Sequence, residues 1–202
     1  GAIQARLLPR RVPAFRSLDC AAAALSSEPV GGDYYDFVRS PDRTVMLTVG
    51  DAAGHGMPAA LMGTWVHAGF RDRARRGAMP GHLLTSLNLD LVALNQPDVF
   101  VALLCARLDV RAATLTYANA GLTPPLLRRR DGRVEVLAQS GVLLGVTAGA
   151  RYADTRVELD AGDIVVLYSD GLTEARRGGE EFGLDGLQRV LDAHARRSAA
   201  DI

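Results

Sequence analysis

The chain has 202 residues, of which 48% are hydrophobic and 23% charged, and its formal net charge at pH 7 is zero. This length predicts a single domain, residues 1–202, with a core of ordinary size. All 23 basic side chains are arginine, so P-loop and Schiff-base lysine chemistry is excluded, and the balanced charge argues against nucleic-acid binding.

The cysteines and the apolar runs exclude further classes of protein. Cys20 and Cys105 both lie in apolar stretches, which predicts buried, reduced thiols rather than a disulfide framework or a zinc site. No apolar stretch reaches the roughly 18 residues that a membrane span needs, and no signal-peptide pattern is present. We therefore expect a cytoplasmic protein without membrane contact.

The predicted elements are two long helices with strands before and after them in the sequence. Residues 1–8 are expected to be the end of an upstream linker helix that Pro9 stops. Apolar repeats at helical spacing begin at Pro58 and near Pro80. Strands are expected at residues 18–25, 44–49, 99–108, 113–118, 134–137, 156–159 and 164–168, with a hairpin turn at Asp131-Gly132. Because hairpins rather than βαβ units connect them, the class is α+β.

Three segments place aspartate beside glycine at strand boundaries: residues 30–37, 49–58 and 167–174. Asp51 and Asp170 directly follow apolar strands, and Asp33 follows two glycines. Such residues emerge at one edge of a sheet, where loops build sites. Glycine next to each acid allows a ligand to approach the backbone.

Converging carboxylates without lysine repel one another unless a cation joins them. Oxygen ligands suit Mg²⁺ or Mn²⁺, and two such ions about 3.5–4 Å apart can clamp a phosphoryl group and activate water. The alternative is structural, because Asp-Gly pairs commonly form turns. Asp131-Gly132 and Asp185-Gly186 are expected to be turns of this kind.

These segments resemble the ordered motifs of SpoIIE-type bacterial phosphatases, within the metal-dependent serine/threonine phosphatase superfamily typified by protein phosphatase 2C. The resemblance runs from residue 3 to about residue 200, with further matches at residues 117–125 and 168–175. It implies a central β-sandwich of two antiparallel sheets flanked by helices. It also implies that Asp51 bridges two Mn²⁺ or Mg²⁺ ions, helped by the Ala52 carbonyl, while Asp170 binds the first ion and Asp33 binds the second directly or through water.

Three neighbouring residues are candidates for supporting the ligands or facing the phosphate: Asp36, His55 and Gly171. For Asp36 a structural role is an equal alternative, and for His55 we favour a loop-positioning role over catalysis. Residues 101–102 and 121–124 depart from the family pattern. The family also carries a further Asp-Asp pair on a last strand, and we expect this chain to lack that strand and its preceding helix. Asp201 is therefore not assigned as a ligand.

The remaining histidines and the arginine clusters are expected to be structural. Helix packing or surface positions are predicted for His67, His82 and His194. Dipole compensation and solvation are predicted for the arginines at the end of the first long helix, which are Arg71, Arg73, Arg75 and Arg76.

The resemblance implies a phosphatase that removes phosphate from phosphoserine or phosphothreonine on an anti-anti-sigma-type regulator, using metal-activated water. It implies an upstream sensor module in the same protein and allows a homodimer. A catalytically impaired domain that only binds the regulator is the alternative from another class. A hydrolase of small phosphomonoesters would share the same metal core.

Overall fold

The computed structural model describes residues 9, 12, 15, 17–25, 31–40, 42, 44–54, 56–94, 99–137 and 141–202, so the expected helix at residues 1–8 lies outside it. The strands are β1 (Tyr34–Arg39), β2 (Val45–Ala52), β3 (Val101–Asp109), β4 (Thr114–Ala120), β5 (Leu126–Arg128), β6 (Val134–Val136), β7 (Thr155–Glu158), β8 (Ile164–Val166), β9 (Arg176–Arg177) and β10 (Glu180–Glu181). The helices are α2 (Gly56–Arg75), α3 (Pro80–Ala93), α4 (Asp170–Thr173) and α5 (Gly183–His194), followed by a 3₁₀ turn at Ala199–Asp201.

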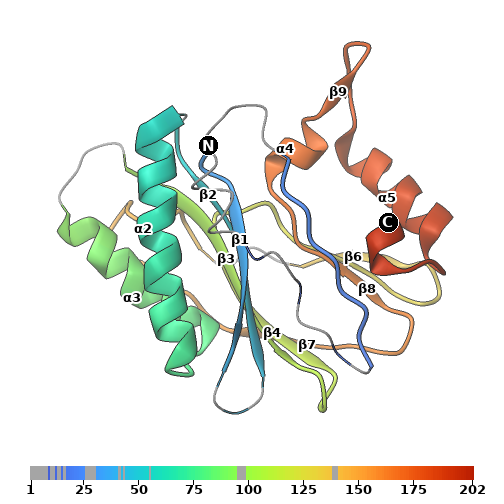
Figure 1. Cartoon of the computed structure of the whole chain (residues 1–202), viewed down its shortest axis with the longest axis horizontal. Coiled ribbons are helices and arrows are strands. Elements are labelled where there is room, and N and C mark those ends of the chain that lie inside the picture. Colours follow the sequence, from blue (N-terminus) through green and yellow to red (C-terminus); the bar gives the residue numbers. More distant parts are fainter. Residues whose placement is uncertain are drawn as a thin grey trace.

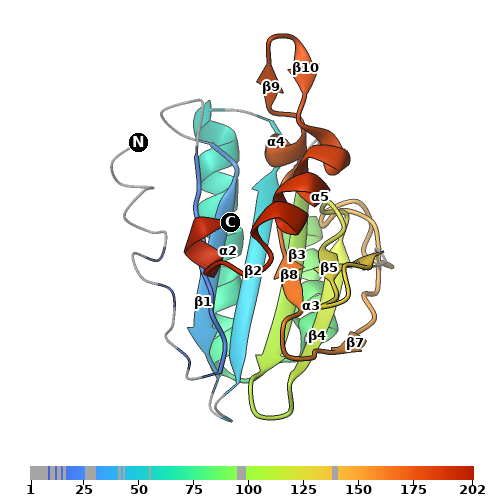
Figure 2. The same cartoon turned by 90° about the vertical axis from the view of Figure 1, so that its right-hand side faces the viewer.

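Two antiparallel sheets form the centre of the molecule. The first has five strands in the order β1-β2-β3-β4-β7, and the second has three in the order β6-β5-β8. In the first sheet, β1 pairs with β2 so that Tyr34 lies opposite Gly50 and Asp36 opposite Thr48. The strands β9 and β10 form a separate hairpin that projects from the body (Figure 2).

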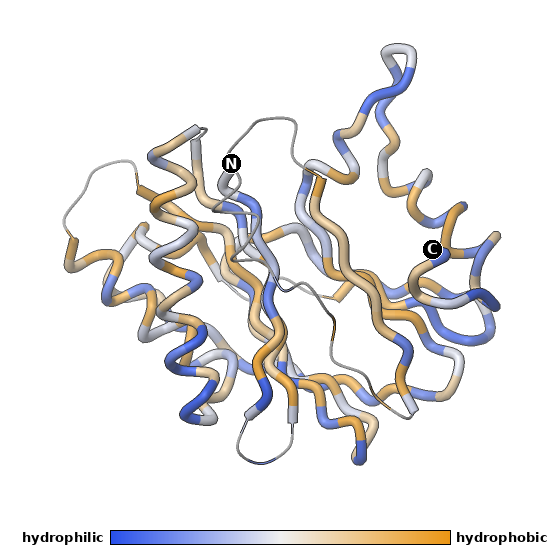
Figure 3. Tube along the Cα trace, viewed as in Figure 1, coloured by the Kyte–Doolittle hydropathy of each residue, from blue (hydrophilic) through white to orange (hydrophobic). Residues whose placement is uncertain are grey.

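The alternation of side chains along the strands builds four layers. On β3, Leu103 packs toward α2 and α3, whereas Leu104 packs toward the second sheet. On β5, Leu127 joins that central core, and Leu126 faces Leu187 on α5. The order of layers is therefore helices, five-stranded sheet, three-stranded sheet and helix (Figure 1). Apolar residues follow the strands of both sheets, and the β9–β10 hairpin is hydrophilic (Figure 3).

The predicted sandwich of two antiparallel sheets flanked by helices is confirmed. Two local predictions are wrong, because residues 18–25 form no strand and Asp185-Gly186 lies in α5 rather than in a turn. The strand β1 was not among the expected strands. None of the helices in the described ranges is both long and apolar enough to cross a membrane.

Candidate functional site

Three predicted aspartates meet at one end of the sandwich. Tyr34 on β1 pairs with Gly50 on β2. Asp33, which precedes Tyr34, and Asp51, which follows Gly50, are therefore neighbours. Asp170 begins α4, just beyond the second sheet's β8. Ser169, the residue before it, donates a hydrogen bond from Oγ to Asp33 Oδ2 at 3.2 Å. The site therefore draws residues from both sheets, and Figure 2 shows α4 beside the end of β2.

The pKa values of Asp33 and Asp51 are raised in the way expected for buried acids that repel one another. Burial, followed by the charges of Asp33 and Asp170, raises the pKa of Asp51 to about 6. Burial also raises the pKa of Asp33, and the charge of Asp170 adds to this, while the hydrogen bond from Ser169 opposes it. Asp33 and Asp51 share a hydrogen bond. A proton or a cation is therefore needed to hold these oxygens together at neutral pH.

Glycine makes the approach of the two strand ends possible. A Cβ atom on Gly32 would lie 2.4 Å from the Ala52 carbonyl oxygen and 2.9 Å from Asp51 Oδ1. The Gly32 carbonyl in turn accepts a hydrogen bond from the Ala52 amide at 3.4 Å. At Gly171 a Cβ would meet Asp33 Oδ2 at 3.9 Å, which is an ordinary contact. Ala52 and Gly171 thus lie beside the aspartate group.

The donor chemistry fits a hard divalent ion. Its groups are carboxylate oxygens with a backbone carbonyl beside them, which Mg²⁺ and Mn²⁺ prefer over the nitrogen and sulfur ligands of zinc. Within the described part of the chain, no three His, Cys, Asp or Glu side chains form a ready-made metal-holding group. Asp33 and Asp51 are in hydrogen-bond contact, and the charge of Asp170 raises the pKa of both.

Asp36 lies apart from this pair, inside the layer between β1 and α2. Its side chain is 1% exposed, and its Oδ2 lies 2.7 Å from His67 Nε2 and 2.6 Å from Arg71 Nη1. Sequence reasoning missed both partners of Asp36. The prediction that Arg71 is a solvated charge at the helix end is wrong, because Arg71 pairs with Asp36. The same prediction is wrong for Arg73, which pairs with Asp90 on α3. The four-residue spacing of His67 and Arg71 on one helix face was the available signal. His55 lies outside the described residues.

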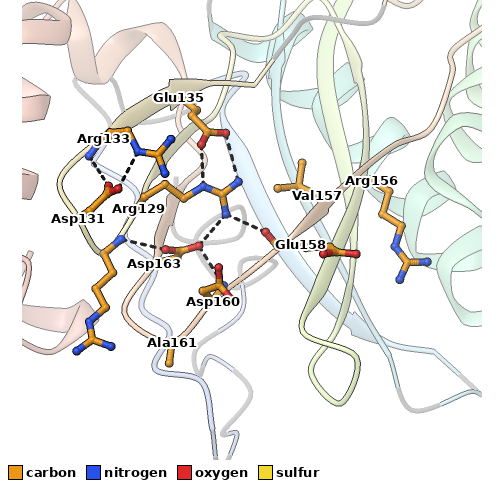
Figure 4. A pocket seen from close by; sticks show the side chains of 11 residues that line it. Arg129, Asp131, Arg133, Glu135, Arg156, Val157, Glu158, Asp160, Ala161 and Asp163 are labelled. Carbon is orange, nitrogen blue, oxygen red and sulfur yellow. Dashed lines mark hydrogen bonds and ion pairs between the residues drawn. The ribbon is translucent and has the colours of Figure 1, made fainter.

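A depression of about 1110 Å³ lies elsewhere, beside β5, β6 and β7 (Figure 4). Two of its four arginines are engaged by acids within the depression itself. Arg129 contacts Glu135 at 2.8 Å and Asp163 at 2.9 Å, and Arg133 contacts Asp131 at 2.7 Å. The hydrogen bond from Arg129 lowers the pKa of Glu135. These pairs offset part of the positive charge that an anionic ligand would need, so the aspartate group is the stronger candidate site.

Comparison with known proteins finds a described family whose model matches most of this chain. The model of the stage II sporulation protein E (SpoIIE) family matches residues 41–202. Phosphoserine phosphatase RsbU of Bacillus subtilis is 28% identical over 201 residues, which cover 99% of this chain and 60% of RsbU. Protein IcfG of Synechocystis is 25% identical over 222 residues, which cover 94% of this chain and 34% of IcfG. The chain thus spans less than two thirds of either relative.

A solved structure shares the fold. The SiaA-PP2C domain of Pseudomonas aeruginosa superposes with a TM-score of 0.72 at 25% identity, covering 85% of this chain and 70% of that domain.

Proposed function

Because the chain belongs to the stage II sporulation protein E family, we propose that it is a metal-dependent protein serine/threonine phosphatase. The observation that carries the proposal is the hydrogen-bonded pair Asp33 and Asp51 at the meeting point of the two sheets, with Asp170 close enough to raise the pKa of both. The name of RsbU, a phosphoserine phosphatase, supports the same reaction.

In this mechanism Asp51, Asp33 and Asp170, with the Ala52 carbonyl, would hold the divalent ions. Divalent ions bound there supply an acidified water at neutral pH and positive charge for the phosphoryl oxygens. Ser169 orients the Asp33 carboxylate through its hydroxyl.

The proposed substrate is a phosphoserine or phosphothreonine on a regulatory protein of the anti-anti-sigma type, and the proposed setting is the cytoplasm. The support is the similarity to RsbU and to the phosphoserine phosphatase RsbP of Bacillus subtilis. An upstream sensor module in the same protein is part of this proposal, and the matched region is 60% of RsbU, so that relative carries further sequence. A domain that binds the regulator without hydrolysing it is the competing proposal.

The test is hydrolysis of an aryl phosphate with Mn²⁺. We expect a chelator to abolish turnover and Asp51→Ala to lower it by about 100-fold or more, because the shared ligand is lost. Asp185→Ala, which removes an exposed acid on α5, serves as the matched control and keeps full activity.

Turnover that survives both the chelator and Asp51→Ala would contradict the metal mechanism. An unaltered chain that binds a phosphorylated regulator without any turnover would favour the binding module instead.

A further inference from the structure

A buried ionic cluster joins β1 to α2. Asp36 Oδ1 accepts a hydrogen bond from the Phe37 amide at 2.8 Å, and Oδ2 faces His67 Nε2 and Arg71 Nη1. The side chains of Asp36 and His67 are 1% and 8% exposed. The ring of Tyr34 lies against that of His67, with centroids 5.3 Å apart.

The same face of α2 reaches the aspartate group. Gly63, His67 and Arg71 follow one another at four-residue spacing and so lie in one row along the helix. At Gly63 the helix contacts the site segment directly, because a Cβ there would lie 3.0 Å from the Gly32 carbonyl oxygen and 3.8 Å from the Ala52 Cβ. The row that begins at the site thus ends at the buried Asp36.

Gly32 transmits this contact to the ligands. It is pressed between Gly63 on one side and the Ala52 backbone and Asp51 Oδ1 on the other. Asp33 is the next residue along the chain. The position of α2 along β1 therefore sets how the segment carrying Asp33 lies against Asp51.

We propose that His67 and Arg71, acting through Asp36, are positioning residues for the divalent-ion site. They fix the position of α2 along β1 and its rotation about its own axis. Through the contact between Gly63 and Gly32, this placement of α2 determines how Asp33 lies relative to Asp51. This inference rests on the proposed function, because it concerns the same carboxylate site.

Stability alone does not account for the cluster. Apolar side chains of similar volume hold a helix on a sheet at least as well as a buried ion pair does. Apolar packing tolerates sliding, whereas the two contacts to one carboxylate oxygen are met at a single register of α2. The ion pairs of Asp36 depend on geometry, so they fix the register of α2 on β1 more than they add to the strength with which the helix is held there.

The test is the affinity of the whole chain for Mn²⁺ alone, measured by titration calorimetry at a temperature where near-ultraviolet circular dichroism shows each variant folded. We expect Arg71→Met and His67→Leu to weaken Mn²⁺ binding by about 10- to 100-fold, as the loss of groups supporting metal ligands does elsewhere. Arg71→Lys, which keeps the charge, restores most of the affinity.

The matched control is Arg73→Met. Arg73 lies on the same helix and pairs with Asp90 and Ser86 on α3, so its loss removes an ion pair without touching β1. We expect unchanged Mn²⁺ affinity in this variant, even if its melting temperature falls.

Equal Mn²⁺ affinity in Arg71→Met and the unaltered chain would overturn the inference and leave the proposed function standing. Absence of Mn²⁺ binding by the unaltered chain would overturn the proposed function and the inference with it. If His67→Leu does not fold, the partly exposed Arg71 decides the matter through Arg71→Met.

Discussion

At Gly32 the absence of a side chain lets two aspartate-bearing segments touch. We predict that Gly32→Ala lowers the free energy of unfolding by about 1–3 kcal/mol, because the new methyl group would overlap backbone atoms of Ala52 that cannot rotate away. Mn²⁺-dependent turnover falls with it, since Asp33 and Asp51 are pushed apart. Denaturant unfolding and aryl phosphate hydrolysis measure the two effects.

The control for this substitution is Gly171→Ala, at a position beside the same carboxylates. There the nearest atoms to a Cβ are Asp33 Oδ2 at 3.9 Å and Ser169 Oγ at 4.0 Å, which are ordinary contacts. We expect the stability of this variant to stay within about 0.5 kcal/mol of the parent. Equal stability of both variants would show that the close packing at Gly32 is absent in solution.

Residue types and their local context were enough to predict the carboxylates of the site but not their supports. Asp33, Asp51 and Asp170 stand out because each lies beside glycine at a strand boundary, and the structure brings them together. The partners of Asp36 are 31 and 35 residues away along the chain. Local spacing carries no information about which strand a helix face will cover, so that cluster had to be seen in three dimensions.

At the scale of elements, apolar periodicity predicts most strands and both long helices. It fails where side chains are small or the pattern is polar. Half of the run at residues 18–25 is alanine, which buries little area and has low preference for strands, and Leu25 at its end is 97% exposed. In α5, Leu187 and Leu191 pack with Leu126 of the second sheet, and the Asp185-Gly186 pair was wrongly interpreted as a turn instead of part of this helix.

The connection between β1 and β2 is tied to β3 by an acid whose pKa is shifted. Hydrogen bonds from the Thr44 hydroxyl at 2.6 Å and from the Thr44 amide, together with Arg107 on β3, lower the pKa of Asp42 to about 2. A folded-state pKa below the unfolded value stabilises the fold above pH 4, and this contribution disappears as the pH falls toward 2.

We therefore predict that Asp42→Asn lowers the free energy of unfolding at pH 7 by about 0.5–1 kcal/mol, a small value because the side chain is 45% exposed. The difference from the parent shrinks between pH 4 and pH 2. Urea unfolding at several pH values measures it, and Thr44→Ser, which keeps the hydroxyl, serves as control. A difference that stays constant down to pH 2 would contradict the assignment.

At the scale of the whole molecule, the site lies where the two sheets meet. Asp33 and Asp51 belong to the five-stranded sheet, while Asp170 follows the last strand of the three-stranded sheet. Each sheet is otherwise bound to its own helices by a separate apolar cluster. An ion held by all three carboxylates would therefore act as a cross-link between the halves of the sandwich.

This arrangement predicts that Mn²⁺ raises the melting temperature of the whole domain. A ligand that binds only the folded state adds about 2.7 kcal/mol at one hundred times its dissociation constant. We expect Asp170→Asn to remove most of this gain, because it takes away the charge through which the second sheet's side raises the pKa values of Asp33 and Asp51. Asp201→Asn keeps the gain, since the Asp201 carboxylate accepts a hydrogen bond from Ser198 Oγ at 2.6 Å in an exposed turn. Differential scanning calorimetry with Mn²⁺ and with chelator measures each shift. A gain that persists in Asp170→Asn would mean that the ion is held by the first sheet alone and does not join the two halves.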